Sequence, residues 1–236
     1  MNVSIILPTY NERHNIVDLI DAIEAEVVPK VNGVQIVVVD DNSPDGTADA
    51  VRQRAQNHTQ ARIDLHVRIE ERGLASAIKY GLQRCEGDVV IIMDTDFNHD
   101  PKMIPQMIDL LKYYDIIIGS RFVVGGGMEE EMRYKLSFLY NLFIRVTIRT
   151  QIQDNLSGFF AMRRDKLMVL NLDRIFRGYG EYFIRLLYVA WRRNYKMLEV
   201  PTFYLLRRHG QSKSRFYHML RDYTMCVLSL LLGRWE

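Results

Sequence analysis

The sequence predicts an α/β protein with a doubly wound, mostly parallel sheet and helices on both faces. Short apolar runs alternate with segments of helical periodicity between residues 3 and 94. The apolar runs contain too few polar residues to leave one face of a sheet in water, which is typical of a parallel sheet covered on both sides. Polar residues close the strands, and ligands of such sheets bind beyond the carboxyl ends of the strands.

The expected elements follow in a regular order along the chain. Strands are predicted where apolar runs are short, at 3–8, 35–41, 63–70, 88–94 and 115–121. Helices are predicted where apolar residues recur every three or four positions, at 12–27, 45–58 and 73–85. The polar sequences that close the strands are PTYNE, DDNSPDG, DTDFNHD and GSR. They are expected to line one crevice.

Composition limits the class of protein and its partners. The chain has 236 residues, 48% of them hydrophobic, enough for one large domain with appendages. Its net charge is only +2, but Lys and Arg crowd the region from Arg133 to Arg221, which indicates an anionic partner. Cys85 and Cys226 lack metal-ligand spacing, and the first strand begins without a basic leader. A reduced, cytoplasmic protein is therefore expected.

The strand ends carry carboxylates in place of a phosphate loop. Neither G-x-G-x-x-G nor G-x-x-x-x-G-K-[ST] follows the first strand, so hydride transfer and ATP hydrolysis lose support. Asp94 and Asp96 instead follow an apolar strand one residue apart. Two like charges can hold a nucleotide's phosphates only through a divalent cation, so Mg²⁺ or Mn²⁺ is implied. Asp41, which closes another strand, is interpreted as an acceptor of hydrogen bonds from a base or ribose.

A set of motifs in a fixed order resembles a known family. They are ILPTYNE, VVVDDNSPDGT, ERGLASAIKYG, DVVIIMDTDFNHDP, IIIGSRFVVGG, DNLSGFFAMRR and VPTFYLLRRHGQSKS, and they cover about residues 3 to 215. The sequence resembles the family 2 glycosyltransferases of the GT-A fold, most closely the dolichol-phosphate and polyprenyl-phosphate mannose synthases. The resemblance implies a GT-A catalytic domain at 1–215, followed by a C-terminal amphipathic helix at 216–236.

The resemblance also implies an activity and its site residues. The expected reaction transfers a hexose, usually mannose from GDP-mannose, to a membrane polyprenyl phosphate with inversion; UDP-glucose as donor is the alternative. Metal ligands are expected at Asp94, Asp96 and Asn98. Donor nucleotide contacts are expected at Pro8, Tyr10, Glu12, Val39, Asp41, Asp94, Thr95, Arg207 and Lys213. Catalytic roles are expected for Asp96, Arg121, Arg133 and Ser137. No nucleic-acid partner is expected.

The acceptor decides which groups the chemistry needs. A phosphate monoester is ionised near neutral pH, so it can attack without a general base, but cations must hold it beside the donor diphosphate. Arg133 and Ser137 are four residues apart and share a helix face, which continues through Asn141, Arg145 and Arg149. The opposite, apolar side of that helix has two readings: contact with a membrane interface, or packing on the sheet. It consists of Leu136, Leu139, Leu142, Phe143 and Val146.

Two alternatives to the transfer onto a polyprenyl phosphate stay open at this point. A glycosyltransferase acting on a hydroxyl would need a base, and Asp154 or Glu181 would have to supply it. A binding module that kept the fold without catalysis is a further class. His99 and His209 are interpreted as packing or outer-shell residues.

The C-terminal segment 223–232 is too short to cross a bilayer, which takes roughly 20 apolar residues. It has two readings, a membrane-surface anchor or a helix that packs on the core or on another subunit. A peripheral protein at the cytoplasmic face of a membrane is expected.

Overall fold

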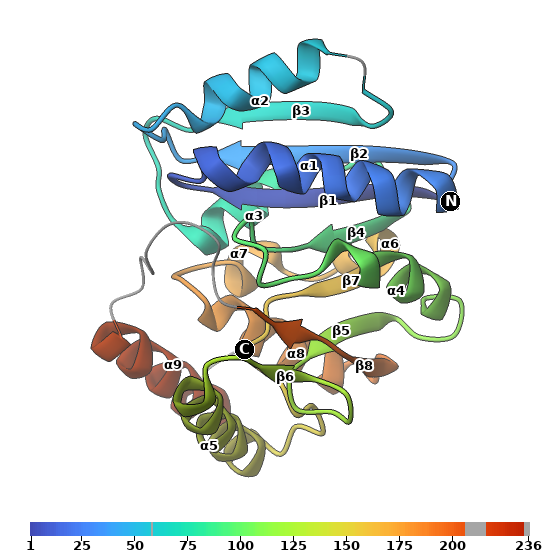
Figure 1. Cartoon of the computed structure of the whole chain (residues 1–236). Coiled ribbons are helices and arrows are strands. Elements are labelled where there is room, and N and C mark those ends of the chain that lie inside the picture. Colours follow the sequence, from blue (N-terminus) through green and yellow to red (C-terminus); the bar gives the residue numbers. More distant parts are fainter. Residues whose placement is uncertain (58, 206–215, 234–236) are drawn as a thin grey trace.

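The computed structural model describes residues 1–57, 59–205 and 216–233. Its main sheet has seven strands in the order β3-β2-β1-β4-β7-β5-β8, which run from top to bottom in Figure 1. Only β7 is antiparallel to its neighbours in this sheet. The strands are β1 (Asn2–Thr9), β2 (Gly33–Asp40), β3 (Arg62–Val67), β4 (Val89–Ile92), β5 (Ile116–Ser120), β7 (Phe160–Arg163) and β8 (Met197–Pro201). Two short strands, β6 (Gly127–Met128) and β9 (Phe203–Tyr204), pair separately.

Helices cover both faces of the sheet, as the dense apolar runs predict. One face packs against α1 (Arg13–Val27), α2 (Thr47–Gln56) and α4 (Ile104–Leu110). The other packs against α3 (Leu74–Leu82), α6 (Arg164–Met168), α7 (Leu172–Ile175) and α8 (Glu181–Arg192). Single turns of 3₁₀ helix follow α1 (Val28–Lys30) and precede α4 (Pro101–Met103). The predicted α/β class with a mostly parallel, helix-covered sheet is confirmed.

Two further helices lie side by side outside these layers, at the lower left of Figure 1. They are α5 (Glu131–Ile148) and α9 (Phe216–Leu231). A third hydrophobic cluster joins them to α8 through residues such as Ile144, Ile184 and Val227. Within the described residues, none of the helices is long and apolar enough to cross a membrane. The division of the chain at residue 215 stays a prediction.

Candidate functional site

A pocket of about 380 Å³ opens at the carboxyl ends of β1, β2 and β4. This is the edge at which parallel sheets bind their ligands. Of the residues predicted to contact the donor, the pocket is lined by Pro8, Tyr10, Glu12, Asp41, Asp94, Thr95 and Asp96. The strand ends that the sequence marked as polar therefore do meet in one place.

Asp41 forms one end of the pocket and is held by a buried ion pair. Its Oδ1 accepts hydrogen bonds from Arg68, with Nε at 2.7 Å, and its Oδ2 accepts the backbone N–H of Gly73 at 2.8 Å. Gly73 has a φ of +142°, a conformation that side chains disfavour, so glycine allows this contact. A carboxylate has about four acceptor positions, so Oδ2 keeps one for a ligand in the pocket.

The wall beside Asp41 contains residues to which sequence reasoning gave no role. The guanidinium of Arg72 lies 5.1 Å from the centre of the Tyr10 ring, a cation–π distance. Tyr179, from the loop before α8, lines the same pocket. Arg72 belongs to the motif ERGLASAIKYG, so its position was visible in the sequence, but Tyr179 is far from the other pocket residues along the chain. Only the folded chain brings Tyr179 to them.

The metal motif follows β4 directly. Asp94 and Asp96 line the pocket, whereas Asn98 is buried beside it and donates from Nδ2 to Asp96 Oδ2 at 2.8 Å. Within the described residues, no group of three His, Cys, Asp or Glu side chains could enclose a metal ion. Two carboxylates still fit Mg²⁺ or Mn²⁺, because such ions are commonly held by one or two carboxylates together with substrate phosphates. In this arrangement Asn98 orients Asp96, and its role as a ligand stays a prediction.

His99 lies beneath the metal motif and is wholly buried. Its Nδ1 accepts the backbone N–H of Asp94 at 2.9 Å, and its Nε2 is 2.9 Å from the hydroxyl of Tyr204. Burial lowers the pKa of His99 to about 4, so the ring is neutral at pH 7. A neutral ring that accepts at Nδ1 carries its proton on Nε2. The expectation that His99 is an outer-shell residue agrees with this geometry.

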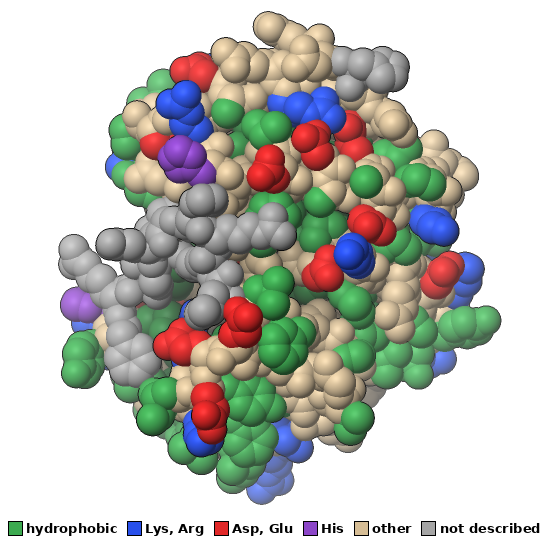
Figure 2. Space-filling view, in the orientation of Figure 1, with side chains coloured by type: hydrophobic (Ala, Val, Ile, Leu, Met, Phe, Trp, Pro, Cys, Tyr) green, Lys and Arg blue, Asp and Glu red, His purple; other side chains and the backbone are tan. Residues whose placement is uncertain are grey.

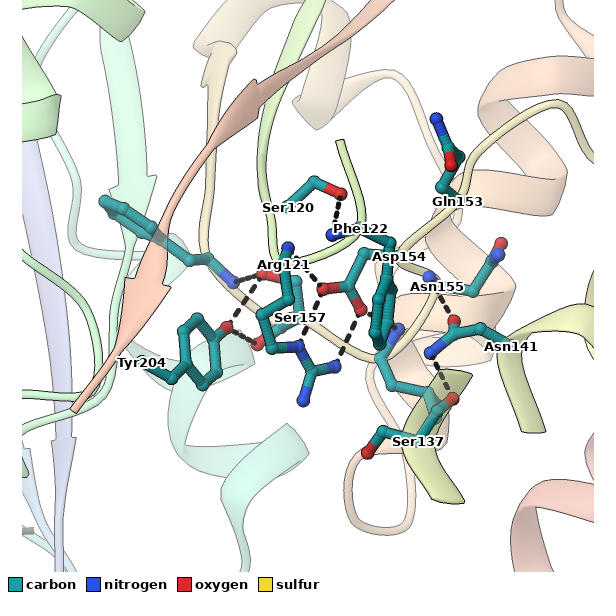
Figure 3. A network of polar contacts seen from close by, with 12 residues as sticks. Ser120, Arg121, Phe122, Ser137, Asn141, Gln153, Asp154, Asn155, Ser157 and Tyr204 are labelled. Atoms are coloured by element: carbon teal, nitrogen blue, oxygen red, sulfur yellow. Dashed lines mark hydrogen bonds and ion pairs between the residues drawn. The ribbon is translucent and has the colours of Figure 1, made fainter. Parts of the chain in front are cut away.

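Arg121 follows β5 and forms a buried ion pair with Asp154 (Figure 3). Its Nε and Nη2 donate to the two carboxylate oxygens at 2.8 and 2.7 Å, and its backbone N–H donates to Oδ2 at 3.0 Å. Burial opposes the charge of Arg121, but the adjacent carboxylate outweighs it and raises the pKa of the guanidinium above its ordinary value. Arg121 is therefore a fixed cation, held to Asp154 through Nε, Nη2 and its backbone N–H.

In α5, which carries Arg133 and Ser137, the burial of the two sides is the reverse of that in an ordinary surface helix. Asn141 on the predicted polar stripe is buried, where its Oδ1 accepts from the backbone N–H of Asn155 and its Nδ2 donates to the carbonyl of Ser137 (Figure 3). The predicted apolar side faces outward: Leu136, Leu139, Leu142, Phe143 and Val146 are between 38% and 72% exposed. The reading in which this side packs on the sheet is therefore wrong.

The other predicted residues that the structure describes are not among those that line the pocket. Val39 is fully buried in β2 and packs in the hydrophobic core, and its donor contact stays a prediction. Arg133 is exposed near the N-terminus of α5, with Nη1 3.9 Å from Glu130. The predicted residues Arg207, Lys213 and His209 lie outside the described part of the chain.

The family follows from comparison with known proteins. The model of the family "Glycosyl transferase family 2" matches residues 4–170, which is more than half of the chain. The chain belongs to glycosyl transferase family 2. The match includes β1, β2, β4 and β5, and therefore both the metal motif and Arg121. The predicted family 2 glycosyltransferase class is confirmed.

Two relatives of this family 2 glycosyltransferase are named for lipid-linked mannose transfer. The Dolichol-phosphate mannosyltransferase of Pyrococcus furiosus is 36% identical over 220 residues, 90% of this chain and 59% of the relative. The chain thus spans less than two thirds of that protein. The Undecaprenyl-phosphate mannosyltransferase of Micrococcus luteus is 33% identical over 90% of this chain and 87% of the relative.

Solved structures show the same fold. Glucosyl-3-phosphoglycerate synthase from Mycobacterium tuberculosis, in complex with Mn²⁺, UDP and glucosyl-3-phosphoglycerate, has a TM-score of 0.73 and 21% identity, covering 98% of this chain and 80% of that one. The same enzyme with Mg²⁺ and UDP has a TM-score of 0.71 and 21% identity, over 98% and 79%. The GT-A fold is therefore confirmed.

Proposed function

We propose that this protein transfers a hexose, mannose from GDP-mannose, to a polyprenyl or dolichyl phosphate with inversion, using Mg²⁺ or Mn²⁺. Both named relatives support the reaction class, since each is called a polyprenyl-type phosphate mannosyltransferase. The pocket at the ends of β1, β2 and β4 supports a nucleotide-sugar donor, with its carboxylates aimed at the diphosphate through a metal ion.

One observation carries the choice of acceptor: both alternative bases are buried and already hydrogen-bonded within the protein. Asp154 is fully buried and accepts four hydrogen bonds, three from Arg121 and one from the backbone N–H of Leu156. Glu181 is also buried, lies 3.7 Å from Arg185 and accepts the backbone N–H of Tyr179. A hydroxyl acceptor needs a base, whereas an ionised phosphate does not. The arrangement therefore favours a phosphate acceptor.

In the proposed reaction, one group of residues binds the metal ion and the donor, and another group binds the acceptor phosphate. Asp94 and Asp96 would hold the metal ion, which neutralises charge on the leaving diphosphate when bound. Arg121, with Arg133 and Ser137 from α5, would hold the acceptor phosphate close to the anomeric carbon. Keeping two anions together in a fixed orientation is the main catalytic task when the nucleophile is already ionised.

The outward apolar side of α5 supports a membrane-bound acceptor. The helix α9 packs beside α5 and also has exposed apolar side chains, so the two helices together are a candidate for contact with lipid. Figure 2 shows hydrophobic side chains gathered over α5 at the bottom of the view. On α9 the exposed side chains include Tyr217, Met225, Leu228 and Leu231. We propose that this surface, defined here as the α5–α9 face, lies on the membrane and presents Arg133 to the lipid phosphate.

The test follows radiolabelled mannose from GDP-mannose into organic-extractable lipid and into water-soluble glycan. Transfer to the lipid phosphate is expected, and label found only in soluble glycans would refute the proposal. Arg133→Ala should abolish acceptor use and leave donor binding near wild type, because Arg133 lies outside the donor pocket. Lys135→Ala is the matched control, since Lys135 is an exposed cation on the same helix paired with Glu131.

The second candidate donor is UDP-glucose, because structural neighbours contain UDP or UDP-glucose in their complexes. A thermal-shift comparison of GDP-mannose, UDP-glucose, GDP and UDP, each with Mn²⁺, separates the two. Stabilisation by the uridine compounds alone would replace the proposed donor and leave the phosphate acceptor standing.

A further inference from the structure

Just after β4, a side chain replaces the sheet as the hydrogen-bond partner of the backbone. The last backbone bond from this strand to β1 runs from Met93 N to the carbonyl of Ile6, at 3.4 Å. The next N–H, that of Asp94, donates to His99 instead. Phe97 adopts a φ of +62°, a left-handed conformation that is uncommon outside glycine, and the chain turns here so that His99 returns beneath the carboxylates.

His99 itself has little freedom to move. Its ring stacks on Phe159 with centroids 4.8 Å apart and packs edge-on to Tyr204. Its Nδ1 is committed to Asp94, so Nε2 carries the proton and donates to the hydroxyl of Tyr204 at 2.9 Å. That hydroxyl in turn donates to the carbonyl of Ser157 at 3.1 Å.

Tyr204 also touches the acceptor end of the site. The guanidinium carbon of Arg121 lies 4.8 Å from the centre of the Tyr204 ring, within cation–π range. Tyr204 is buried in β9, and Figure 3 shows its hydroxyl directed at Ser157, close to the Arg121–Asp154 pair. One tyrosine therefore contacts both the residue under the metal motif and the fixed cation.

We propose that His99 and Tyr204 are positioning residues that hold the backbone of Asp94 in a fixed relation to Arg121. This inference rests on the proposed function in one respect: it takes Asp94 and Asp96 as the metal-binding carboxylates. Losing the hydrogen bond between His99 and Tyr204 would leave the ring held only by its packing, so His99 would fix the Asp94 backbone less firmly. Outer residues of this kind typically change metal affinity or activity by about 10- to 100-fold when removed.

The first experiment measures Mn²⁺ affinity directly by electron paramagnetic resonance, in the presence of GDP and without acceptor. His99→Asn keeps an acceptor near the position of Nδ1 but loses the contact with Tyr204, and Tyr204→Phe loses the same contact from the other side. Each is expected to weaken Mn²⁺ binding by about tenfold or more. Tyr195→Phe is the matched control, because that hydroxyl donates to the carbonyl of Lys166 and Tyr195 does not line the pocket.

The double variant gives a sharper result than either single one. Both substitutions remove the hydrogen bond between His99 and Tyr204, and Tyr204→Phe also removes the contacts of the hydroxyl with Ser157. Because the first bond is shared, the combined loss should stay well below the product of the two single losses. If the double variant lost Mn²⁺ affinity by the product of the two single fold-losses, the two residues would act separately and the inference would be wrong. Near-ultraviolet circular dichroism and melting temperature show whether each variant keeps the native fold; Tyr204→Phe retains the ring and its packing.

A third variant separates the two ends of the site. Tyr204→Phe keeps an aromatic face under Arg121, so the KM for the polyprenyl-phosphate acceptor should stay within about twofold of wild type. Tyr204→Leu removes that face as well and should raise the acceptor KM by about fivefold or more, in addition to weakening Mn²⁺ binding. Equal acceptor KM values for the two variants would refute the link to Arg121.

Failure of the inference can be told from failure of the proposed function. Wild-type protein that binds no Mn²⁺ with nucleotide would refute the metal assignment and the inference with it. Wild-type binding that His99→Asn and Tyr204→Phe leave unchanged would refute only the inference.

Discussion

Replacing Asp154 with asparagine tests how the buried cation Arg121 is held. The substitution keeps the size of the side chain but removes the charge that balances Arg121, which is only 4% exposed. Removing one partner of a buried ion pair costs about 3–5 kcal/mol, and we expect the lower end because asparagine still offers one acceptor oxygen. A loss of about 3 kcal/mol lowers the melting temperature of a chain of this size by roughly 6–12 °C.

Urea unfolding, followed by circular dichroism, measures the change in the free energy of unfolding. Asp165→Asn is the matched control, because Asp165 pairs with Arg163 in the same two-pronged way but at the surface, with both side chains about half exposed or more. Its loss should stay below about 1 kcal/mol. Equal losses for the two variants would show that burial of the Arg121–Asp154 pair has no energetic consequence, and the reasoning would fail.

The same variant also reports on the chemistry. If the acceptor phosphate is the nucleophile, the acidic limb of the rate profile follows its second pKa, near 6, and Asp154→Asn should keep the shape of that limb. A profile that loses the limb in this variant would identify Asp154 as a base and restore the hydroxyl acceptor.

Three other perturbations have expected outcomes. Asp96→Asn should lower kcat/KM by about 10³-fold, or about 4 kcal/mol, and remove metal-dependent nucleotide binding in calorimetry; full activity of the wild type in excess EDTA would contradict this. Leu139→Asp with Val146→Asp should lower partition onto lipid vesicles by more than about tenfold in flotation assays, since both side chains are exposed on α5; unchanged flotation would exclude the α5–α9 face. Cys85, whose pKa burial raises to about 12, and the buried Cys226 should not react with a thiol reagent at pH 8 until urea unfolds the protein; rapid labelling of native protein would contradict their burial.

The amino-terminal half of the fold was predictable because its signals are local. β1, β2 and β4 are short apolar runs, β3 alternates apolar with polar residues, and each helix between these strands has its own periodicity. The second half gave weaker signals. The antiparallel insertion of β7 between β4 and β5 depends on pairing between residues more than forty positions apart, such as Ile91 with Ala161, and no local pattern encodes that partner.

The site was predictable in its residue types and less so in its contacts. Carboxylates after strand ends indicated a metal-dependent nucleotide site, but the ion pair of Asp41 with Arg68 and that of Arg121 with Asp154 join distant segments. The amphipathic pattern of α5 could not show which face is buried, because the pattern defines two faces without saying which one packs against the protein. Asn141 decides it, since its buried amide bonds the loop at Asn155.

The insertion of β7 between β4 and β5 sets the distance between the ends of these two strands as well as their order in the sheet. Neighbouring strands lie about 4.8 Å apart, so the ends of β4 and β5, with one strand between them, stand about 10 Å apart along the edge of the sheet. That gap separates the carboxylates after β4 from the cation after β5, and the hydrogen bonds of β7 to both neighbours maintain it. The sheet thus places two groups of opposite charge after strand ends that are two strand spacings apart, and it fixes that spacing before any ligand binds.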